Sequence, residues 1–200
     1  MRHISTILFD LGNVLTYIDF NAFWRDLGFL RKEEIAPFKG GYKDLTLRYE
    51  TGYISTDDYL NGLRNVFKNK YTIVQLEQAF SCIIQQPVEG MTDIVKRVSD
   101  KHQTALVSNT NEIHYRLSLK KFEGLKILQK HYLSYQLRVM KPASGFYDAI
   151  IKDQGILPSK MLFIDDITEN VKAAKSAGMQ AIQFEITKQL ETDLKKIGIL

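Results

Sequence analysis

Residues 7–15 read Ile-Leu-Phe-Asp-Leu-Gly-Asn-Val-Leu, and the rest of the chain is best interpreted from this stretch. A strand-like segment that starts at Ile4 closes with three apolar residues and ends abruptly at Asp10, and a Gly-Asn pair begins two residues later. Short apolar runs of this length are typical of buried strands, and a Gly-Asn pair favours a sharp turn. The pattern predicts a strand over residues 4–9 whose end projects the Asp10 carboxylate into a cleft. A carboxylate that merely caps the turn is the alternative that this stretch leaves open.

Beyond this stretch, strand-like and helical patterns alternate along the chain. Further strand-like runs lie at residues 104–108, 132–137, 161–164 and 181–184. Helical patterns lie at residues 91–101, 113–122, 145–154, 168–177 and 188–197. Alternating strands and helices favour a parallel sheet with helices on both faces. The predicted fold class is therefore α/β, with a Rossmann-like parallel sheet.

Residues 16–86 break this alternation, because they show successive amphipathic helical patterns and no convincing strand. The sequence Ser-Thr-Asp-Asp at residues 55–58 is typical of a capped helix start, and Thr72 is expected to begin the next helix. We interpret this region as a small helical cap inserted after the first strand. The predicted core domain then comprises residues 1–15 and 87–200, and the predicted cap domain residues 16–86.

Composition limits the classes of protein to which the chain can belong. Of its 200 residues 44% are hydrophobic and 25% are charged, and the formal net charge is +4. The basic residues are spread along the chain, which disfavours a nucleic-acid partner. No run of 18 apolar residues is present, so no membrane span or membrane partner is expected. Cys82 is the only cysteine, which suits a cytoplasmic location. We expect a monomer or a homodimer with a small anionic substrate.

Polar residues follow three more of the predicted strands, and the carboxyl ends of parallel strands are where ligands bind in open sheets. Ser108 and Asn109 end one strand and could bind a phosphate oxygen, although both types are also common helix caps. Lys141 could offset the charge of a phosphate, although most lysines are simply solvated. Asp165 and Asp166 end another strand. Adjacent carboxylates are costly without a compensating cation, and oxygen ligands suit Mg²⁺.

These four segments, in this order, resemble the four motifs of the haloacid dehalogenase-like (HAD-like) hydrolase superfamily. The resemblance covers nearly the whole chain. Residues 9–15, Phe-Asp-Leu-Gly-Asn-Val-Leu, are similar to the first motif of a bacterial subgroup of sugar-phosphate phosphatases that includes α-D-glucose-1-phosphate phosphatase. Residues 50–55, Glu-Thr-Gly-Tyr-Ile-Ser, also resemble that subgroup.

The resemblance implies a magnesium-dependent phosphatase that acts on a small phosphate ester. In such enzymes a nucleophilic aspartate, here Asp10, attacks phosphorus, and water then hydrolyses the aspartyl-phosphate. The implied magnesium ligands are Asp10, the carbonyl group of Gly12 and Asp166. Asp165 is implied either as a further ligand or as a residue that contacts the ligands without touching the ion. The implied phosphate contacts are Ser108, Asn109 and Lys141, with Lys141 also neutralising charge during catalysis.

One position departs from the pattern that the superfamily's phosphatases usually show. A second aspartate two residues after the nucleophile usually serves as general acid and base, and here that position is Gly12. General acid–base catalysis is worth about 10²–10⁴-fold. The substrate is therefore expected to be a sugar 1-phosphate or similar ester, whose leaving group needs less protonation. Alternatively a carboxylate of the cap, Asp19 or Glu50, supplies the proton.

Two rival interpretations use the same fold. A 2-haloacid dehalogenase has the same nucleophilic aspartate but needs no metal, and the adjacent Asp165 and Asp166 favour phosphate chemistry over it. A catalytically weak binding protein could have kept the scaffold after losing the acid at Gly12.

Overall fold

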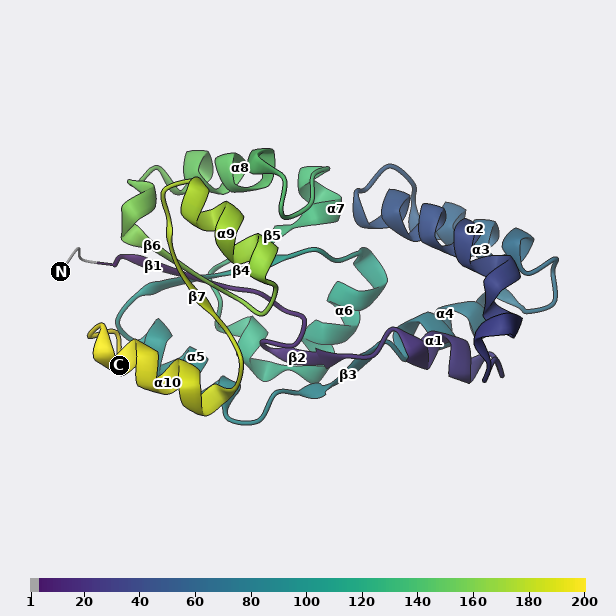
Figure 1. Ribbon diagram of the computed structural model, residues 1–200, viewed down its shortest axis with the longest axis horizontal. Helices are drawn as coiled ribbons and strands as arrows, with labels where there is room; N and C mark the ends of the chain where they lie inside the picture. Colours follow the sequence, from purple (N-terminus) through teal and green to yellow (C-terminus); the bar gives the residue numbers. More distant parts are fainter. Residues whose placement is uncertain (1–3) are drawn as a thin grey trace.

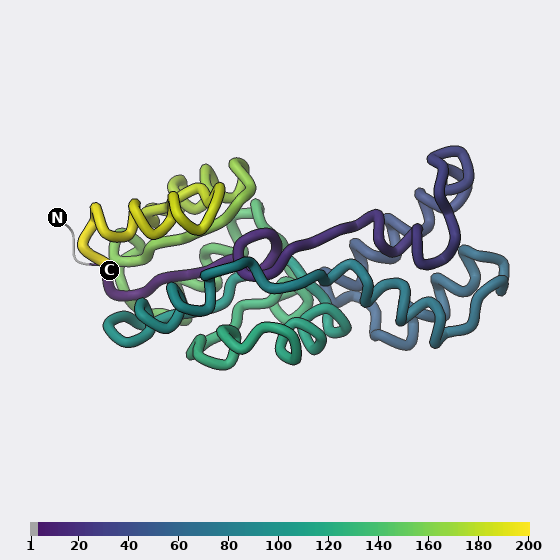
Figure 2. The backbone as a smooth tube through the Cα atoms, turned by 90° about the horizontal axis from the view of Figure 1, so that it is seen from below, coloured from purple at the N-terminus to yellow at the C-terminus, as the bar shows by residue number. Residues whose placement is uncertain are grey.

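The computed structural model describes residues 4–200, which form an elongated molecule with two parts joined by a narrow connection (Figures 1 and 2). The larger part contains a five-stranded parallel sheet in the order β5-β4-β1-β6-β7. Its strands are β1 (Thr6–Phe9), β4 (Gln103–Ser108), β5 (Lys130–Leu133), β6 (Met161–Asp165) and β7 (Gln180–Gln183). The predicted α/β fold with a Rossmann-like parallel sheet is therefore confirmed.

Helices cover both faces of this sheet, as Figure 1 shows. They are α5 (Met91–Ser99), α6 (Glu112–Lys121), α7 (Ser134–Leu137), α8 (Ser144–Gln154), α9 (Thr168–Ser176) and α10 (Thr187–Lys196), with short 3₁₀ turns at Glu123–Lys126 and Pro158–Lys160. None of the helices within residues 4–200 combines the length and the apolar character needed to cross a bilayer.

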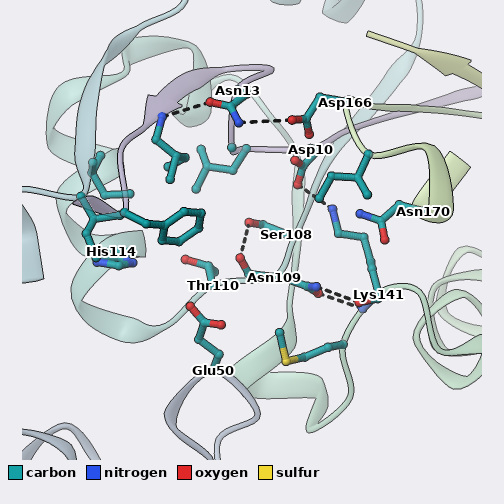
Figure 3. Close-up of a pocket in the computed structure, with 18 residues that line it drawn as sticks. Asp10, Asn13, Glu50, Ser108, Asn109, Thr110, His114, Lys141, Asp166 and Asn170 are labelled. Atoms are coloured by element: carbon teal, nitrogen blue, oxygen red, sulfur yellow. Dashed lines mark hydrogen bonds and ion pairs between the residues drawn. The ribbon is translucent and has the colours of Figure 1, made fainter. Parts of the chain in front are cut away.

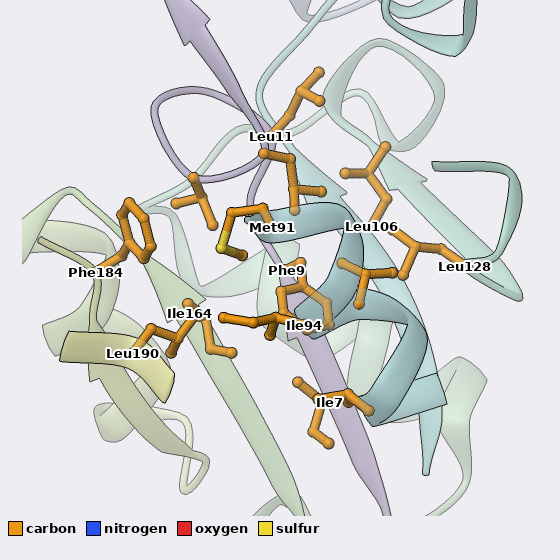
Figure 4. Packing of buried hydrophobic residues seen from close by; sticks show 14 of the residues in the cluster. Ile7, Phe9, Leu11, Met91, Ile94, Leu106, Leu128, Ile164, Phe184 and Leu190 are labelled. Atoms are coloured by element: carbon orange, nitrogen blue, oxygen red, sulfur yellow. The ribbon is translucent and has the colours of Figure 1, made fainter. Parts of the chain in front are cut away.

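The central strand β1 is buried on both faces because its side chains alternate between two apolar clusters. Ile7 and Phe9 pack with side chains of α5 and α10 (Figure 4), whereas Leu8 packs with side chains of α8 and α9 on the opposite face. All four residues of β1 are buried. This double burial explains why residues 7–9 are all apolar and why Asp10 marks the end of the strand so sharply.

The smaller part consists of α1 (Asn21–Asp26), α2 (Lys32–Glu50), α3 (Thr56–Val66) and α4 (Ile73–Ser81). These helices share a third apolar cluster rich in aromatic rings, such as the stacked pair Tyr49 and Tyr59, whose ring centroids lie 4.5 Å apart. The predicted starts of the helices after Ser55 and Thr72 are confirmed. The Ser55 hydroxyl accepts from the Asp58 N–H, and Thr72 caps α4 in the same way. The treatment of residues 16–86 as a separate domain stays a prediction.

Two predictions about strands were wrong. Residues 16–86 do contain strand structure, because β2 (Thr16–Ile18) pairs antiparallel with β3 (Ile84–Pro87) and forms the connection between the two parts. A three-residue strand is too short to show a period in the sequence. The strand predicted over residues 132–137 ends at Leu133, and Ser134–Leu137 forms one helical turn. The buried Ser134 hydroxyl bonds to backbone groups outside the sheet, and the chain leaves the sheet there.

Candidate active site

A pocket of about 250 Å³ lies at the carboxyl ends of β1, β4 and β6, and residues of the cap, among them Glu50, line its other side (Figure 3). The chain runs from β1 to β4 and β5 on one side of the sheet and returns to β6 and β7 on the other. This reversal of strand order creates a crevice next to the central strand, and ligands bind in such crevices in open parallel sheets. Six of the seven predicted site residues line the pocket, and Asp165 is the one that does not; the six are Asp10, Gly12, Ser108, Asn109, Lys141 and Asp166.

Three carboxylates meet at this rim. One oxygen from each of Asp10, Asp165 and Asp166 lies within 4.8 Å of the others. Burial raises the pKa of Asp10 above its usual range, although the neighbouring Lys141 ammonium opposes the shift. Burial also raises the pKa of Asp166. Carboxylates this close repel one another, so a cation at their centre would lower the free energy of the charged state.

Lys141 already supplies one positive charge to this cluster. Its Nζ atom donates to Asp10 Oδ1 at 2.6 Å, to Asp165 Oδ2 at 2.7 Å and to the Val107 carbonyl at 3.0 Å. Its side chain is only 2% exposed. Burial alone would lower the pKa of Lys141, but the two carboxylates outweigh it and the pKa is raised. The ammonium group is therefore held charged, with all three of its protons committed.

The two adjacent aspartates differ in how their oxygens are occupied. Asp165 is fully buried and accepts from Lys141, from the Ile167 N–H at 2.8 Å and from Asn170 Nδ2 at 3.1 Å. Asp166 is half-buried, lines the pocket and accepts from Asn13 Nδ2 at 3.2 Å. Asp166 therefore has oxygen lone pairs free for a cation, whereas those of Asp165 are directed to protein donors.

Ser108 and Asn109 lie where β4 ends, but they differ in what they can offer to a ligand. The Ser108 side chain lines the pocket. The Asn109 amide exchanges two hydrogen bonds with the backbone of Lys141, accepting from its N–H at 2.8 Å and donating to its carbonyl at 2.9 Å. The Asn109 side chain thus positions Lys141, so its backbone N–H is the group that remains for phosphate.

Gly12 cannot be replaced by an aspartate without rearrangement. A Cβ atom built on Gly12 would lie 3.1 Å from Ile18 Cγ1, which is closer than most contacts between carbon atoms. Of the two cap carboxylates considered above, Asp19 pairs with Arg25 at 2.5 Å and lies outside the pocket lining. Glu50 lines the pocket.

Three residues of the site were missed by sequence reasoning. Asn13 lies inside the quoted first motif and Asn170 lies five residues after Asp165, and their amides hold Asp166 and Asp165. Because both asparagines lie close in sequence to the predicted aspartates, their role in the site could have been predicted. Ser134 hydrogen-bonds to the backbone of Thr110, next to the β4 motif, at 2.9 Å. It lies 24 residues from Thr110 in sequence, and no local pattern marks it.

The chain is similar to several known proteins. A family model described as haloacid dehalogenase-like hydrolase matches residues 4–178. The chain is 29% identical over 200 residues to D-ribitol-5-phosphate phosphatase from Bacteroides thetaiotaomicron, covering 91% of this chain and 92% of the relative. A HAD family enzyme from the same organism superposes with a TM-score of 0.86 at 25% identity, covering 96% of this chain and 99% of the enzyme. The wild-type form of that enzyme in complex with magnesium and inorganic phosphate gives a TM-score of 0.80 at 25% identity, covering 92% and 96% of the two chains.

Proposed function

This chain belongs to the haloacid dehalogenase-like hydrolases, and from that premise we propose that it is a magnesium-dependent phosphatase acting on a small sugar or sugar-alcohol phosphate. Membership of the family, expected from the four motifs, is confirmed. Similarity to the α-D-glucose-1-phosphate phosphatase subgroup stays a prediction. The observation that carries the proposal is the meeting of Asp10, Asp166 and the committed ammonium group of Lys141 at the rim of one pocket.

The donors at this rim fit a magnesium ion. Mg²⁺ prefers oxygen ligands and uses one or two carboxylates together with oxygens of the substrate. In our proposal Asp10, Asp166 and the Gly12 carbonyl hold the ion. Asp165 does not contact the ion but orients Lys141 through their hydrogen bond. When bound, the ion would withdraw negative charge from the phosphoryl oxygens. The related enzyme of known structure binds magnesium and inorganic phosphate together, which supports the same pairing here.

The residues of the chain then divide the work of two displacement steps. An oxygen of Asp10 attacks phosphorus, the bond from phosphorus to the alcohol oxygen breaks, and an aspartyl-phosphate remains. Water attacks phosphorus in the second step and releases inorganic phosphate and free Asp10. Ser108 and the Asn109 N–H hold phosphoryl oxygens, and Lys141 stabilises their charge. In phosphoryl transfer this positioning and charge stabilisation account for most of the catalysis.

The size of the pocket and the relatives support a small substrate. A cavity of about 250 Å³ lies just below the usual range of ligand pockets, about 300–1,000 Å³. The relative named above acts on D-ribitol 5-phosphate, and we propose that this chain takes a phosphate of the same general class. The narrower prediction of a sugar 1-phosphate is tested by comparing glucose 1-phosphate with glucose 6-phosphate. Faster hydrolysis of the 6-phosphate would contradict it.

The test of the proposed function is release of inorganic phosphate from a panel of sugar and sugar-alcohol phosphates, with and without Mg²⁺. The Asp10→Asn variant is expected to lose activity on the order of 10⁴–10⁶-fold, comparable with loss of the nucleophile in other covalent enzymes. Asp19→Asn, which changes an aspartate outside the pocket, is the matched control and should keep wild-type activity. Retained turnover in Asp10→Asn would remove the assigned mechanism.

Two further assays separate the rival interpretations. Chloride release from 2-chloropropionate in the presence of EDTA would support a dehalogenase. Fluoroberyllate binding without turnover of any phosphate ester would support a binding protein.

A further inference from the structure

The proposed reaction leaves one proton unassigned. When an alkyl phosphate is cleaved, the departing alkoxide is a strong base, and it leaves readily only if an acid protonates it. Among residues 4–200, the rim of the core offers no acid for this purpose. Lys141 has all three protons engaged, and Asp10 and Asp166 are needed as charged oxygens. Position 12, the neighbour of the nucleophile, carries no side chain, and Ile18 occupies the space beside it.

The pocket lining contains two further ionisable side chains, Glu50 and His114. His114 is unsuitable because both ring nitrogens are engaged. Nε2 lies 2.9 Å from the Phe80 carbonyl, and Nδ1 lies 3.0 Å from Asn111 Nδ2. Burial lowers the pKa of His114 to about 4, so the ring is neutral near pH 7. Glu50 is therefore the remaining candidate among the residues that line the pocket.

Glu50 is well placed and suitably protonated. It is the last residue of α2, and Figure 3 shows its carboxylate directed from the cap into the pocket that Ser108, Thr110 and Asp10 also line. Burial raises the pKa of Glu50 to about 7, against the opposing effect of a hydrogen bond with Asn111. Burial also raises the pKa of its cap neighbour Tyr42. A carboxyl group with this pKa can both donate and accept a proton near neutral pH.

Contacts between the cap and the core hold Glu50 in this place. The hydroxyl of Ser134, which is fully buried, donates to the Glu50 carbonyl at 2.6 Å and accepts from the Thr110 N–H at 2.9 Å. One side chain thus ties the end of α2 to the loop that follows β4. Two residues beyond Glu50, Gly52 lies so close to the Tyr135 carbonyl oxygen that an added Cβ would approach it to 1.9 Å.

We propose that Glu50 is the general acid and base of the phosphatase reaction, and that Ser134 is a positioning residue for it. In the first step the proton of Glu50 passes to the alcohol oxygen as the bond from phosphorus to that oxygen breaks. In the second step Glu50 takes a proton from the attacking water as the bond from phosphorus to Asp10 breaks, which regenerates the acid. The assignment rests on the proposed function and extends it to the cap.

The experiment compares Glu50→Gln with wild type on two substrates, D-ribitol 5-phosphate and p-nitrophenyl phosphate. The nitrophenolate ion leaves without protonation, so Glu50→Gln should keep a burst of one nitrophenolate per enzyme while its steady-state rate falls. Turnover of the alkyl ester should fall by about 10²–10⁴-fold, the usual worth of general acid–base catalysis. The burst also shows that the variant is folded. Glu33→Gln, an exposed glutamate of the same helix, is the matched control and should behave as wild type.

A pH profile adds a second readout. The acid must be protonated, so the wild-type rate of the alkyl ester should fall as the pH rises above about 7, and this limb should vanish in Glu50→Gln. Three further ionisable groups near Glu50 are Tyr42, Tyr59 and His114. Burial keeps these three neutral in this range, since it raises the pKa of the tyrosines and lowers that of the histidine. The charged groups that face Glu50 are those of the rim, Asp10, Lys141 and Asp166, and those that line an adjoining cavity of the cap, Lys32, Lys39 and Lys43. Ser134→Ala should lower the alkyl-ester rate and leave the nitrophenolate burst unchanged.

The outcomes distinguish this assignment from the function on which it rests. Unchanged turnover of the alkyl ester by Glu50→Gln, or loss of the nitrophenolate burst together with the alkyl-ester rate, would overturn the role of Glu50. If Asp10→Asn is inactive at the same time, the phosphatase function stands. Absence of turnover by the wild-type protein on both substrates would instead overturn the proposed function.

Discussion

The rim of the core and the cap face the same pocket, but they hold their charged groups in different ways. At the rim, Lys141 is locked by three hydrogen bonds and Asp165 by three donors. The cap contributes one carboxyl group, Glu50, which owes its raised pKa mainly to burial and its place to contacts with the core. The rim is therefore a prearranged set of charges for the phosphoryl group, whereas the contribution of the cap depends on how it docks. Three further substitutions test this difference.

The largest effect is expected at the rim, from Lys141→Ala. Removing the ammonium leaves the Asp10 and Asp165 carboxylates buried without their partner, and breaking a buried ion pair in this way costs about 3–5 kcal/mol. Urea unfolding without Mg²⁺ should show this loss, and added Mg²⁺ should recover part of it. Lys130→Ala is the control, because its pair with Asp153 is exposed and such pairs are worth about 0–1 kcal/mol. Equal losses in the two variants would contradict a prearranged rim.

A smaller effect is expected at the docking contact of the cap, from Gly52→Ala. The new Cβ would meet the Tyr135 carbonyl and push the end of α2, and Glu50 with it, away from the pocket. A displacement of about 1 Å can cost about 10²-fold in rate. Turnover of D-ribitol 5-phosphate measures the effect. Gly28→Ala is the matched control, because Gly28 also has a positive φ, +83°, but has no atom within 4 Å of an added Cβ. A similar loss of rate in both variants would show that backbone strain, rather than docking, is responsible.

The smallest effect is expected from Asn13→Gly, at a residue that contacts the proposed metal ligand Asp166. Glycine keeps the positive φ of 54° at this position but removes the amide that holds Asp166. Loss of a partner behind a metal ligand typically weakens metal binding by about 10–100-fold. The measurement is the Mg²⁺ concentration that gives half-maximal activity. Asn69→Gly, at another asparagine of positive φ, should leave that concentration unchanged, and a shift there of the same size would contradict a specific role for Asn13.

Much of the fold and the core side of the site could be predicted because the signals are local. A strand buried on both faces must be an unbroken apolar run, so the polar residue that ends it is visible in the sequence. Asp10, Ser108 and Asp165 each end such a run, and parallel strands bring these ends to one edge. The starts of α3 and α4 could also be predicted from the sequence, because a cap residue and its partner are three residues apart.

The rest was decided by the tertiary structure. Sequence alone left Asp19 and Glu50 as equal candidates for the missing acid, and only the docking of the cap separates them. The same holds for Ile18 beside Gly12 and for Ser134, whose hydrogen bond to Glu50 joins residues 84 apart in sequence. The end of a strand is marked by the residues next to it in sequence. A contact between distant segments depends instead on how two separately packed parts of the molecule meet. The sequence thus determined the sheet and the order of its motifs, and the packing of cap against core determined which carboxyl group faces the nucleophile.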